Sequence, residues 1–199
     1  LVLVGMAIFS IIFYVYFVWS IMTLNSFNFN TTPGLRFGSD QAKASWKEII
    51  NKLGSRILFI TDKGLMSLGL TKQTIDELKK KSSVEVFDNV EADPSKKTLL
   101  NAIEIGKKFN ATGVVGFGGG SSMDVAKLTA LILGSNEDLE KAWGVTNAKG
   151  PRLPLALVPT TAGTGSEVTP FATVWDYTNQ KKKSLSNPAM FAKKAFIDD

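Results

Sequence analysis

Two short segments of this chain combine glycine with hydroxyl side chains in a way that suits a phosphate ligand. The first segment, Gly118–Ser122, consists of three glycines followed by two serines. The second, Thr160–Ser166, mixes threonine, glycine and serine. Glycine lets the backbone approach a phosphate closely, and free backbone N–H groups and hydroxyls then donate hydrogen bonds to its oxygens. Both segments therefore predict contacts with an anionic ligand.

The chain contains no histidine and no cysteine, which limits the chemistry that it can perform. Disulfides and thiolate metal sites are excluded, and so is any metal site that needs imidazole. The formal net charge is +5, with short lysine runs at residues 79–81 and 181–183. Because no aromatic residues are interleaved with these lysines, we expect solvated surface and no nucleic-acid partner.

The first glycine segment lies between a predicted strand and a predicted helix. The apolar run 114–117 is bounded by glycines and predicts a buried strand, and apolar residues recur at helical spacing from Val125 to Leu133. A strand, a glycine turn and a helix in that order form a common anion site. The alternative is a tight turn that binds nothing, in which Ser121 and Asp124 form a capping box and Asp124 pairs with Lys127.

The rest of the chain alternates between the two kinds of element. Strands are predicted at residues 56–60, 84–87, 155–159, 171–175 and 195–197, and helices at residues 40–53, 71–81 and 95–109. This alternation predicts an α/β fold with a mostly parallel sheet and helices on both faces. Ligands of such sheets bind beyond the carboxyl ends of the strands. Asp62, Gly118–Ser121 and Thr160–Thr164 all follow predicted strands, so we expect them at one edge.

Residues 1–21 form an apolar segment, and no charged side chain precedes Arg36. About 20 apolar residues are enough to span a bilayer, but the segment lacks a basic start and a small-residue cleavage site. It is a membrane anchor, a truncated signal sequence, or sequence upstream of a true start at Met22. We favour the third interpretation, because an apolar helix on a folded α/β domain would expose a large apolar surface. Residues 22–199 are then the folded part.

The segments GGGSSMDVAK (118–127) and PTTAGTGSEVTP (159–170) together resemble the iron-containing alcohol dehydrogenase family. The likeness runs from about Phe29 to the last residue, and it includes TDKGL, the loop before Pro94 and KKKSLSNPAMF. Glycerol dehydrogenases and dehydroquinate synthases share the broader fold. The resemblance implies a Rossmann-like, dehydroquinate synthase-like N-terminal domain that binds the nicotinamide nucleotide. A helical domain that holds the metal would follow, and this chain covers only the first domain.

The resemblance also implies roles for residues of the two segments. Gly119, Gly120 and Ser121 would hold the pyrophosphate of NAD. Thr160, Thr161 and Thr164 would line the cofactor near the adenine and its ribose, with Thr164 closest to the phosphates.

Three further positions match the family outside these segments. Asp62 would accept hydrogen bonds from the adenosine ribose and repel a 2′-phosphate, which favours NAD over NADP. Its alternative role is that of a turn or cap residue before Gly64. Lys182 would reach the nicotinamide ribose, and its alternative is a solvated hairpin lysine. Asp93 stands where the family often has asparagine, so an acceptor replaces a donor and its contact with the cofactor stays open.

The implied reaction is hydride transfer between an alcohol carbon and the nicotinamide ring. Divalent iron, or zinc, polarises the substrate oxygen, and its family ligands are one aspartate and three histidines of the helical domain. Asp198 and Asp199 end the last strand and are not expected to be ligands.

The substrate would be a small alcohol or aldehyde, and the complete enzyme a cytoplasmic homodimer or larger oligomer. The alternatives are a non-catalytic nucleotide-binding module and, if residues 1–21 are translated, a membrane-anchored version of the dehydrogenase.

Overall fold

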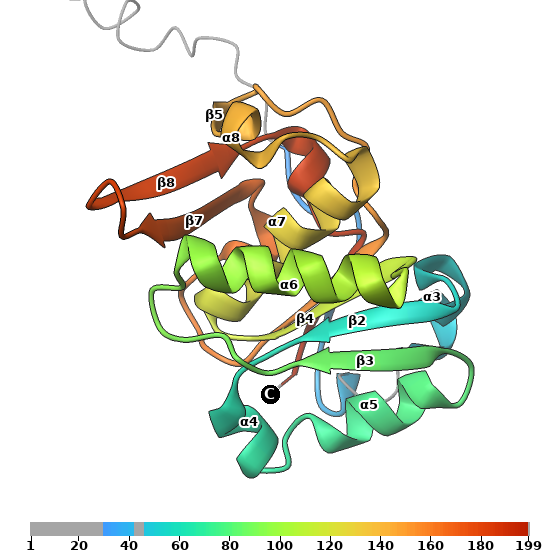
Figure 1. The fold of residues 1–199 in the computed structure, drawn as a ribbon. Coiled ribbons are helices and arrows are strands. Elements are labelled where there is room, and N and C mark those ends of the chain that lie inside the picture. Colours follow the sequence, from blue (N-terminus) through green and yellow to red (C-terminus); the bar gives the residue numbers. More distant parts are fainter. Residues whose placement is uncertain (1–29, 42–45, 199) are drawn as a thin grey trace, which may run out of the picture. The chain divides into compact units, whose positions relative to one another are not determined.

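Six parallel strands form the central sheet of the computed structural model, which describes residues 30–41 and 46–198 (Figure 1). Their order across the sheet is β1-β9-β6-β4-β2-β3, and every neighbouring pair is parallel. The strands are β1 (Leu35–Phe37), β2 (Arg56–Ile60), β3 (Ser83–Phe87), β4 (Gly113–Gly118), β6 (Leu155–Pro159) and β9 (Lys194–Ile197). The predicted α/β, Rossmann-like fold with a mostly parallel sheet is confirmed.

The middle strands are continuous apolar runs because helices cover both faces of the sheet. All six residues of β4 are buried. Val114 packs into the apolar cluster on one face, and its neighbour Val115 packs into the cluster on the other. Successive side chains of a strand point to opposite faces, so a strand covered on both sides needs apolar residues at every position.

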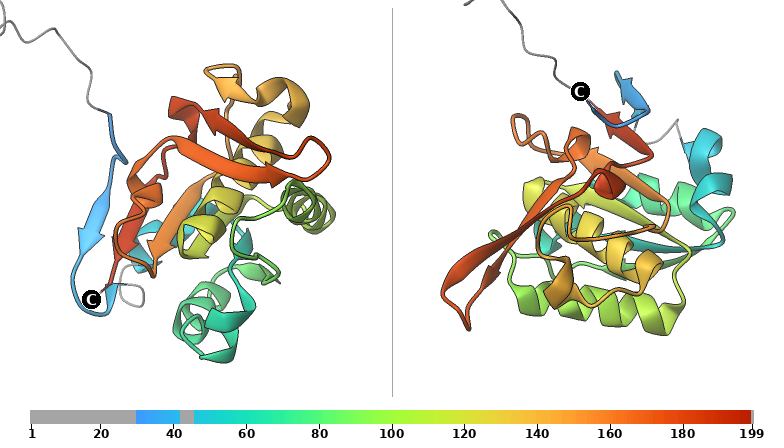
Figure 2. Two further views of the ribbon diagram at one scale, coloured as in Figure 1. Left: turned by 90° about the vertical axis from the view of Figure 1, so that its left-hand side faces the viewer. Right: turned by 90° about the horizontal axis from the view of Figure 1, so that it is seen from above.

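Four helices supply these two layers, and Figure 2 shows them on opposite sides of the sheet. On one face lie α6 (Lys96–Phe109) and α7 (Gly120–Ser135), which bury Leu99 and Leu128 among other residues. On the other face lie α3 (Trp46–Leu53) and α5 (Lys72–Lys79), with Trp46 and Leu78 fully covered. Trp46 packs against Phe196 of β9, with ring centroids 4.9 Å apart. The prediction of helices on both faces is confirmed.

The helices end where the sequence offers capping residues. Ser95 caps α6, its Oγ accepting a hydrogen bond from the backbone N–H of Thr98 at 3.1 Å. Asn110 and Asn136 follow α6 and α7 in the left-handed conformation, which asparagine tolerates better than most residues. The short helix α4 (Lys63–Ser67) begins at Asp62.

A smaller three-stranded sheet of order β5-β8-β7 lies beside the main one. Its antiparallel hairpin, β7 (Phe171–Asp176) and β8 (Lys181–Ser186), extends beyond the main sheet in Figure 1, and β5 (Gly144–Val145) pairs with β8 in parallel. Three short helices complete the described chain: α8 (Leu139–Ala142), η1 (Ser166–Val168) and η2 (Pro188–Met190).

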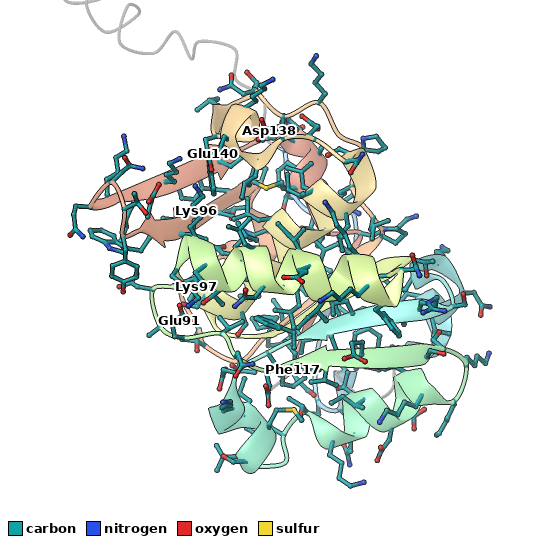
Figure 3. All side chains as sticks on the ribbon, viewed as in Figure 1. Glu91, Lys96, Lys97, Phe117, Asp138 and Glu140 are labelled. Carbon is teal, nitrogen blue, oxygen red and sulfur yellow. The ribbon has the colours of Figure 1, made fainter. Side chains whose placement is uncertain are left out.

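An ion-pair cluster joins this hairpin to the helices around it. Glu140 of α8 accepts from Lys96 of α6 at 2.6 Å, a pair visible in Figure 3, and from Lys183 of β8 at 2.5 Å. Lys183 also lies 3.4 Å from Asp176, which is 1% exposed at the end of β7. A hydrogen bond from the Asn179 side chain, helped by the Asn179 backbone N–H and Lys183, lowers the pKa of Asp176 to about 2.

The depressed pKa of Asp176 predicts an acid-sensitive contribution to stability. Because the native state favours the carboxylate, this contribution is present above the unfolded pKa of about 4 and is lost as pH falls to about 2. Asp176→Asn should therefore lower the melting temperature at neutral pH, and the difference from wild type should narrow between pH 4 and pH 2. Circular dichroism melts across this range would test it. Parallel melting curves for the two proteins at every pH would contradict it.

Some helices and strands of the structure differ in their bounds from the predicted ones, and others were not predicted from the sequence. The predicted helix 71–81 is α5, which is shorter at both ends, and the predicted helix 40–53 is described only from Trp46, since residues 42–45 lie outside the described chain. Strand β8 was missed because its lysines give no apolar alternation, although its partner β7 was predicted. Strand β1 was missed because its three residues are too few to form a recognisable strand pattern.

No helix in the described part of the chain is long and apolar enough to cross a membrane. The apolar segment 1–21 lies outside the described residues, so its predicted exclusion from the folded part stays a prediction.

Candidate functional site

A cleft of about 790 Å³ opens at the carboxyl ends of the central strands. Its lining includes Asp62 after β2, Gly119–Ser121 after β4, and Thr160 and Thr161 after β6. The three segments that the sequence placed at one edge of the sheet therefore meet around one cavity. This edge is where open parallel sheets bind their ligands.

The turn between β4 and α7 needs glycine at its first position. Gly118 has a φ of +147°, which side chains rarely permit, and a Cβ atom there would lie 2.7 Å from Ser122 Oγ. Gly119 is the N-cap residue of α7, and no side chain caps this end of the helix.

The alternative prediction of a capping box is wrong, because Ser121 lies inside the helix and the Asp124 carboxylate accepts hydrogen bonds from residues of η1 and β7. The predicted Asp124–Lys127 pair is present at 3.1 Å.

An uncapped helix start that faces a cleft is suited to an anion. The first N–H groups of a helix have no partner within it, and the helix dipole places partial positive charge at this end. Gly119, Gly120, Ser121 and Ser122 all line the cleft. A phosphate oxygen at this position would accept hydrogen bonds from the first N–H groups of α7, which no side chain caps.

The loop after β6, Thr160–Ser166, which we call the threonine loop, lies directly against this turn. The Thr160 backbone N–H donates to the Gly118 carbonyl at 3.0 Å. A Cβ atom on Gly119 would lie 3.2 Å from Thr161 Oγ1, and one on Gly120 would lie 3.5 Å from the Thr164 side chain. The glycines thus leave a gap between the backbone of the turn and the threonine side chains, which a larger residue would fill.

Asp62 lines the cleft and also caps α4. Its Oδ1 accepts a hydrogen bond from the Leu65 backbone N–H at 3.0 Å, so the predicted cap role is present. A carboxylate has two oxygens and several acceptor positions, and capping therefore leaves Asp62 able to accept from a ligand hydroxyl. The ribose contact stays a prediction.

Asp93 and Lys182 meet at a second, smaller cleft of about 310 Å³. The Lys182 ammonium lies 2.8 Å from Asp93 Oδ1, and both side chains are more than half exposed. Such exposed pairs are weak, so a ligand can displace either partner. Ser121 lines both clefts, so the two cavities adjoin at the start of α7.

Glu91 is a cleft residue that the sequence did not identify. Its carboxylate accepts from the Ser95 backbone N–H at 2.9 Å and from Thr98 Oγ1 at 2.7 Å, and Figure 3 labels it near the start of α6. Partial burial acts to raise the pKa of Glu91, but the hydrogen bonds from Thr98 and Ser95 outweigh it and lower this pKa. The sequence predicted the helix at residues 95–109, but no local pattern indicated that a carboxylate four residues upstream would bond to its N-cap residue, Ser95.

The residues described by the structure include no group of three or more acidic, histidine or cysteine side chains placed to hold a metal ion. The two clefts at this edge are lined by backbone N–H groups, hydroxyls, two lysines and four carboxylates: Lys63, Lys182, Asp62, Glu91, Asp93 and Asp124.

Comparison with curated proteins finds relatives of known activity. The sulfoacetaldehyde reductase of Bilophila wadsworthia is 30% identical over 170 residues, which cover 84% of this chain and 44% of that protein. The choline dehydrogenase of Bacillus subtilis is 35% identical over 168 residues, or 82% of this chain and 42% of that protein. The chain thus spans less than half the length of these relatives.

Solved structures have the same fold. An iron-containing alcohol dehydrogenase of Thermotoga maritima is 34% identical with a TM-score of 0.76, covering 87% of this chain and 48% of its own. The sulfoacetaldehyde reductase of Bifidobacterium kashiwanohense, solved in complex with NAD+, is 28% identical with a TM-score of 0.77, covering 88% and 46%. The model of the iron-containing alcohol dehydrogenase family matches residues 33–199. This chain belongs to the iron-containing alcohol dehydrogenase family.

Proposed function

We propose that this chain is the NAD-binding part of a metal-dependent dehydrogenase that transfers a hydride between a small alcohol or aldehyde and NAD. The observation that carries the proposal is the uncapped start of α7, which opens into a cleft between glycine backbone and threonine hydroxyls. Family membership and the NAD+ complex of the Bifidobacterium kashiwanohense relative support the identity of the ligand.

The cleft offers suitable partners for each part of a dinucleotide. Gly119, Gly120 and Ser121 would bind the pyrophosphate through the free N–H groups of α7. Thr160 and Thr161, which line the cleft, would contact the adenosine side. Thr164 is not among the residues that line this cleft, but its side chain faces Gly120, and it would lie closest to the phosphates. Bound NAD supplies the hydride acceptor, and the protein's part is to bind it and orient its ring.

The nicotinamide end would extend past Ser121 into the second cleft. Lys182 would donate to the nicotinamide ribose there, after exchanging its contact with Asp93 for the ligand. Asp93 lines the same cleft, and as a carboxylate it can accept from a ribose hydroxyl.

The metal would be held by residues outside this chain. With no histidine in the sequence and no ligand cluster among the described residues, the chain does not fit a family metal site of one aspartate and three histidines. We therefore assign iron or zinc binding, and the substrate pocket, to the downstream part of the complete protein. A cytoplasmic location and a homodimeric or larger assembly stay predictions.

The proposal is tested by comparing residues 22–199 with the complete natural protein. The complete protein should reduce NAD+ with short-chain alcohols or diols when iron or zinc is supplied, read as NADH absorbance. Residues 22–199 alone should show no turnover at any iron or zinc concentration, because nothing in them polarises the substrate oxygen or positions the alcohol against the ring.

Two other results would contradict the proposal. Metal-dependent turnover by residues 22–199 would mean that the catalytic site lies in this half. A complete protein that binds NAD+ but turns over no alcohol or aldehyde with either metal would favour the non-catalytic module.

A further inference from the structure

Lys127 of α7 is a fully buried cation that lies outside both clefts. Its ammonium donates to the backbone carbonyls of Ser166 at 2.9 Å, of Thr169 at 3.5 Å, and of Phe171. It also lies 3.1 Å from Asp124 Oδ1 on its own helix. Burial lowers the pKa of Lys127, and the carboxylates of Asp124 and Glu167 oppose that shift. A buried ammonium is costly unless it is paired and hydrogen-bonded, and this one is both.

Asp124 completes the cluster with contacts to the same two segments. Its Oδ1 accepts from Ser166 Oγ at 2.6 Å, and its Oδ2 accepts from the Thr173 backbone N–H at 2.9 Å. The pair therefore fastens α7 both to η1 and to the first half of β7. These segments are about 40 residues away along the chain, and no local sequence rule would bring them together.

The fastened segment is the far end of the threonine loop. The loop begins at Thr160, held by its hydrogen bond to Gly118, and ends at Ser166, held by Lys127 and Asp124. Between these two anchors, residues 161–164 are exposed. The Thr161 hydroxyl stands opposite Gly119, and the Thr164 side chain stands opposite Gly120, at the distances given above.

We propose that Lys127 is a positioning residue for the dinucleotide site. By fixing the exit of the threonine loop onto the helix whose start binds the pyrophosphate, it sets the spacing between the two walls of the cleft. The inference rests on the proposed function, since it concerns the affinity of that site for NAD. Binding groups must be held to about 0.5 Å to act together, and a loop anchored at one end alone would not keep that spacing.

The test is the dissociation constant of NAD+ for the complete protein, measured by isothermal titration calorimetry well below the melting temperature. Lys127→Met keeps the length of the side chain and removes its donors, and it should raise this constant by about tenfold or more. Ser166→Ala removes only the hydroxyl contact with Asp124 and should raise it by about two- to fivefold. Binding stoichiometry should stay near one in both variants.

Arg152→Met is the matched control. Arg152 is a half-buried cation that donates to the carbonyls of Phe191 and Leu153, away from the cleft. Its loss should lower the melting temperature and leave the dissociation constant within about twofold, as expected of a purely structural residue.

The outcomes distinguish failure of the positioning role of Lys127 from failure of the proposed function. A folded Lys127→Met protein with unchanged affinity would overturn the positioning role, even with a lower melting temperature. If Lys127→Met fails to fold, Ser166→Ala decides, and unchanged affinity there overturns the role in the same way. A wild-type protein that binds no NAD+ would instead overturn the proposed function, and the inference with it.

Discussion

Replacing Gly119 with valine is expected to weaken NAD binding by about a hundredfold or more. Even a Cβ atom at this position would lie 3.2 Å from Thr161 Oγ1, and the two methyl groups of valine would fill the gap between the turn and the threonine loop. The phosphate would then lose at least two charge-assisted hydrogen bonds, each worth about 1.5–3 kcal/mol. The backbone at Gly119 has a φ of −73°, which valine adopts without strain, so the fold should survive.

Calorimetric titration of the complete protein with NAD+ measures this effect, and melting curves verify the fold. Arg152→Met is again the control, because the Arg152 guanidinium donates to the carbonyls of Phe191 and Leu153, away from the cleft. Its affinity for NAD+ should stay within about twofold of wild type. Equal binding by wild type and Gly119→Val would remove the glycine turn from the cofactor site.

Removal of the Asp62 carboxylate is expected to change coenzyme choice. Asp62→Gly should weaken NAD by about 1–3 kcal/mol, the usual cost of a lost charged hydrogen bond, and it should relax the bias against NADP by removing charge repulsion. Titrations with both coenzymes on wild type and variant measure the two effects together.

Because Asp62 also caps α4, its two roles must be separated. Asp62→Ser is the matched variant, since serine caps a helix about as well as aspartate but is shorter and uncharged. If the ribose contact is real, Asp62→Ser should show the same loss of selectivity as Asp62→Gly while keeping the melting temperature of wild type. Wild-type selectivity in Asp62→Ser would restrict Asp62 to its cap.

The sequence predicted the parts of the fold that local patterns determine. The strands at residues 56–60 and 155–159 match β2 and β6, because a parallel strand buried on both faces is an uninterrupted apolar run. The predicted helix at residues 95–109 matches α6 and its N-cap residue Ser95. The location of the candidate site was also predicted, because the carboxyl ends of parallel strands lie at the same edge of the sheet.

What the sequence did not predict depends on contacts between distant segments. Lys127 and Asp124 looked like an ordinary pair on a helix surface, yet their partners lie on η1 and β7. The Asp93–Lys182 pair joins the loop after β3 to β8 in the same way. Charged side chains have no periodic signature of burial, so only the assembled fold reveals which of them are enclosed.

The position of β9 between β1 and β6 has a consequence for folding during synthesis. Within the described part of the chain, strand β1 pairs only with β9, with Leu35 opposite Ala195. The ribosome adds the roughly 160 residues between these partners at about 5–20 residues per second, so β1 emerges about 8–32 seconds before its partner. The four strands β2, β3, β4 and β6 can assemble during that interval, since each already has a neighbour. Of the main-sheet strands in residues 30–41 and 46–198, the one that is made first therefore docks only when the last has been made.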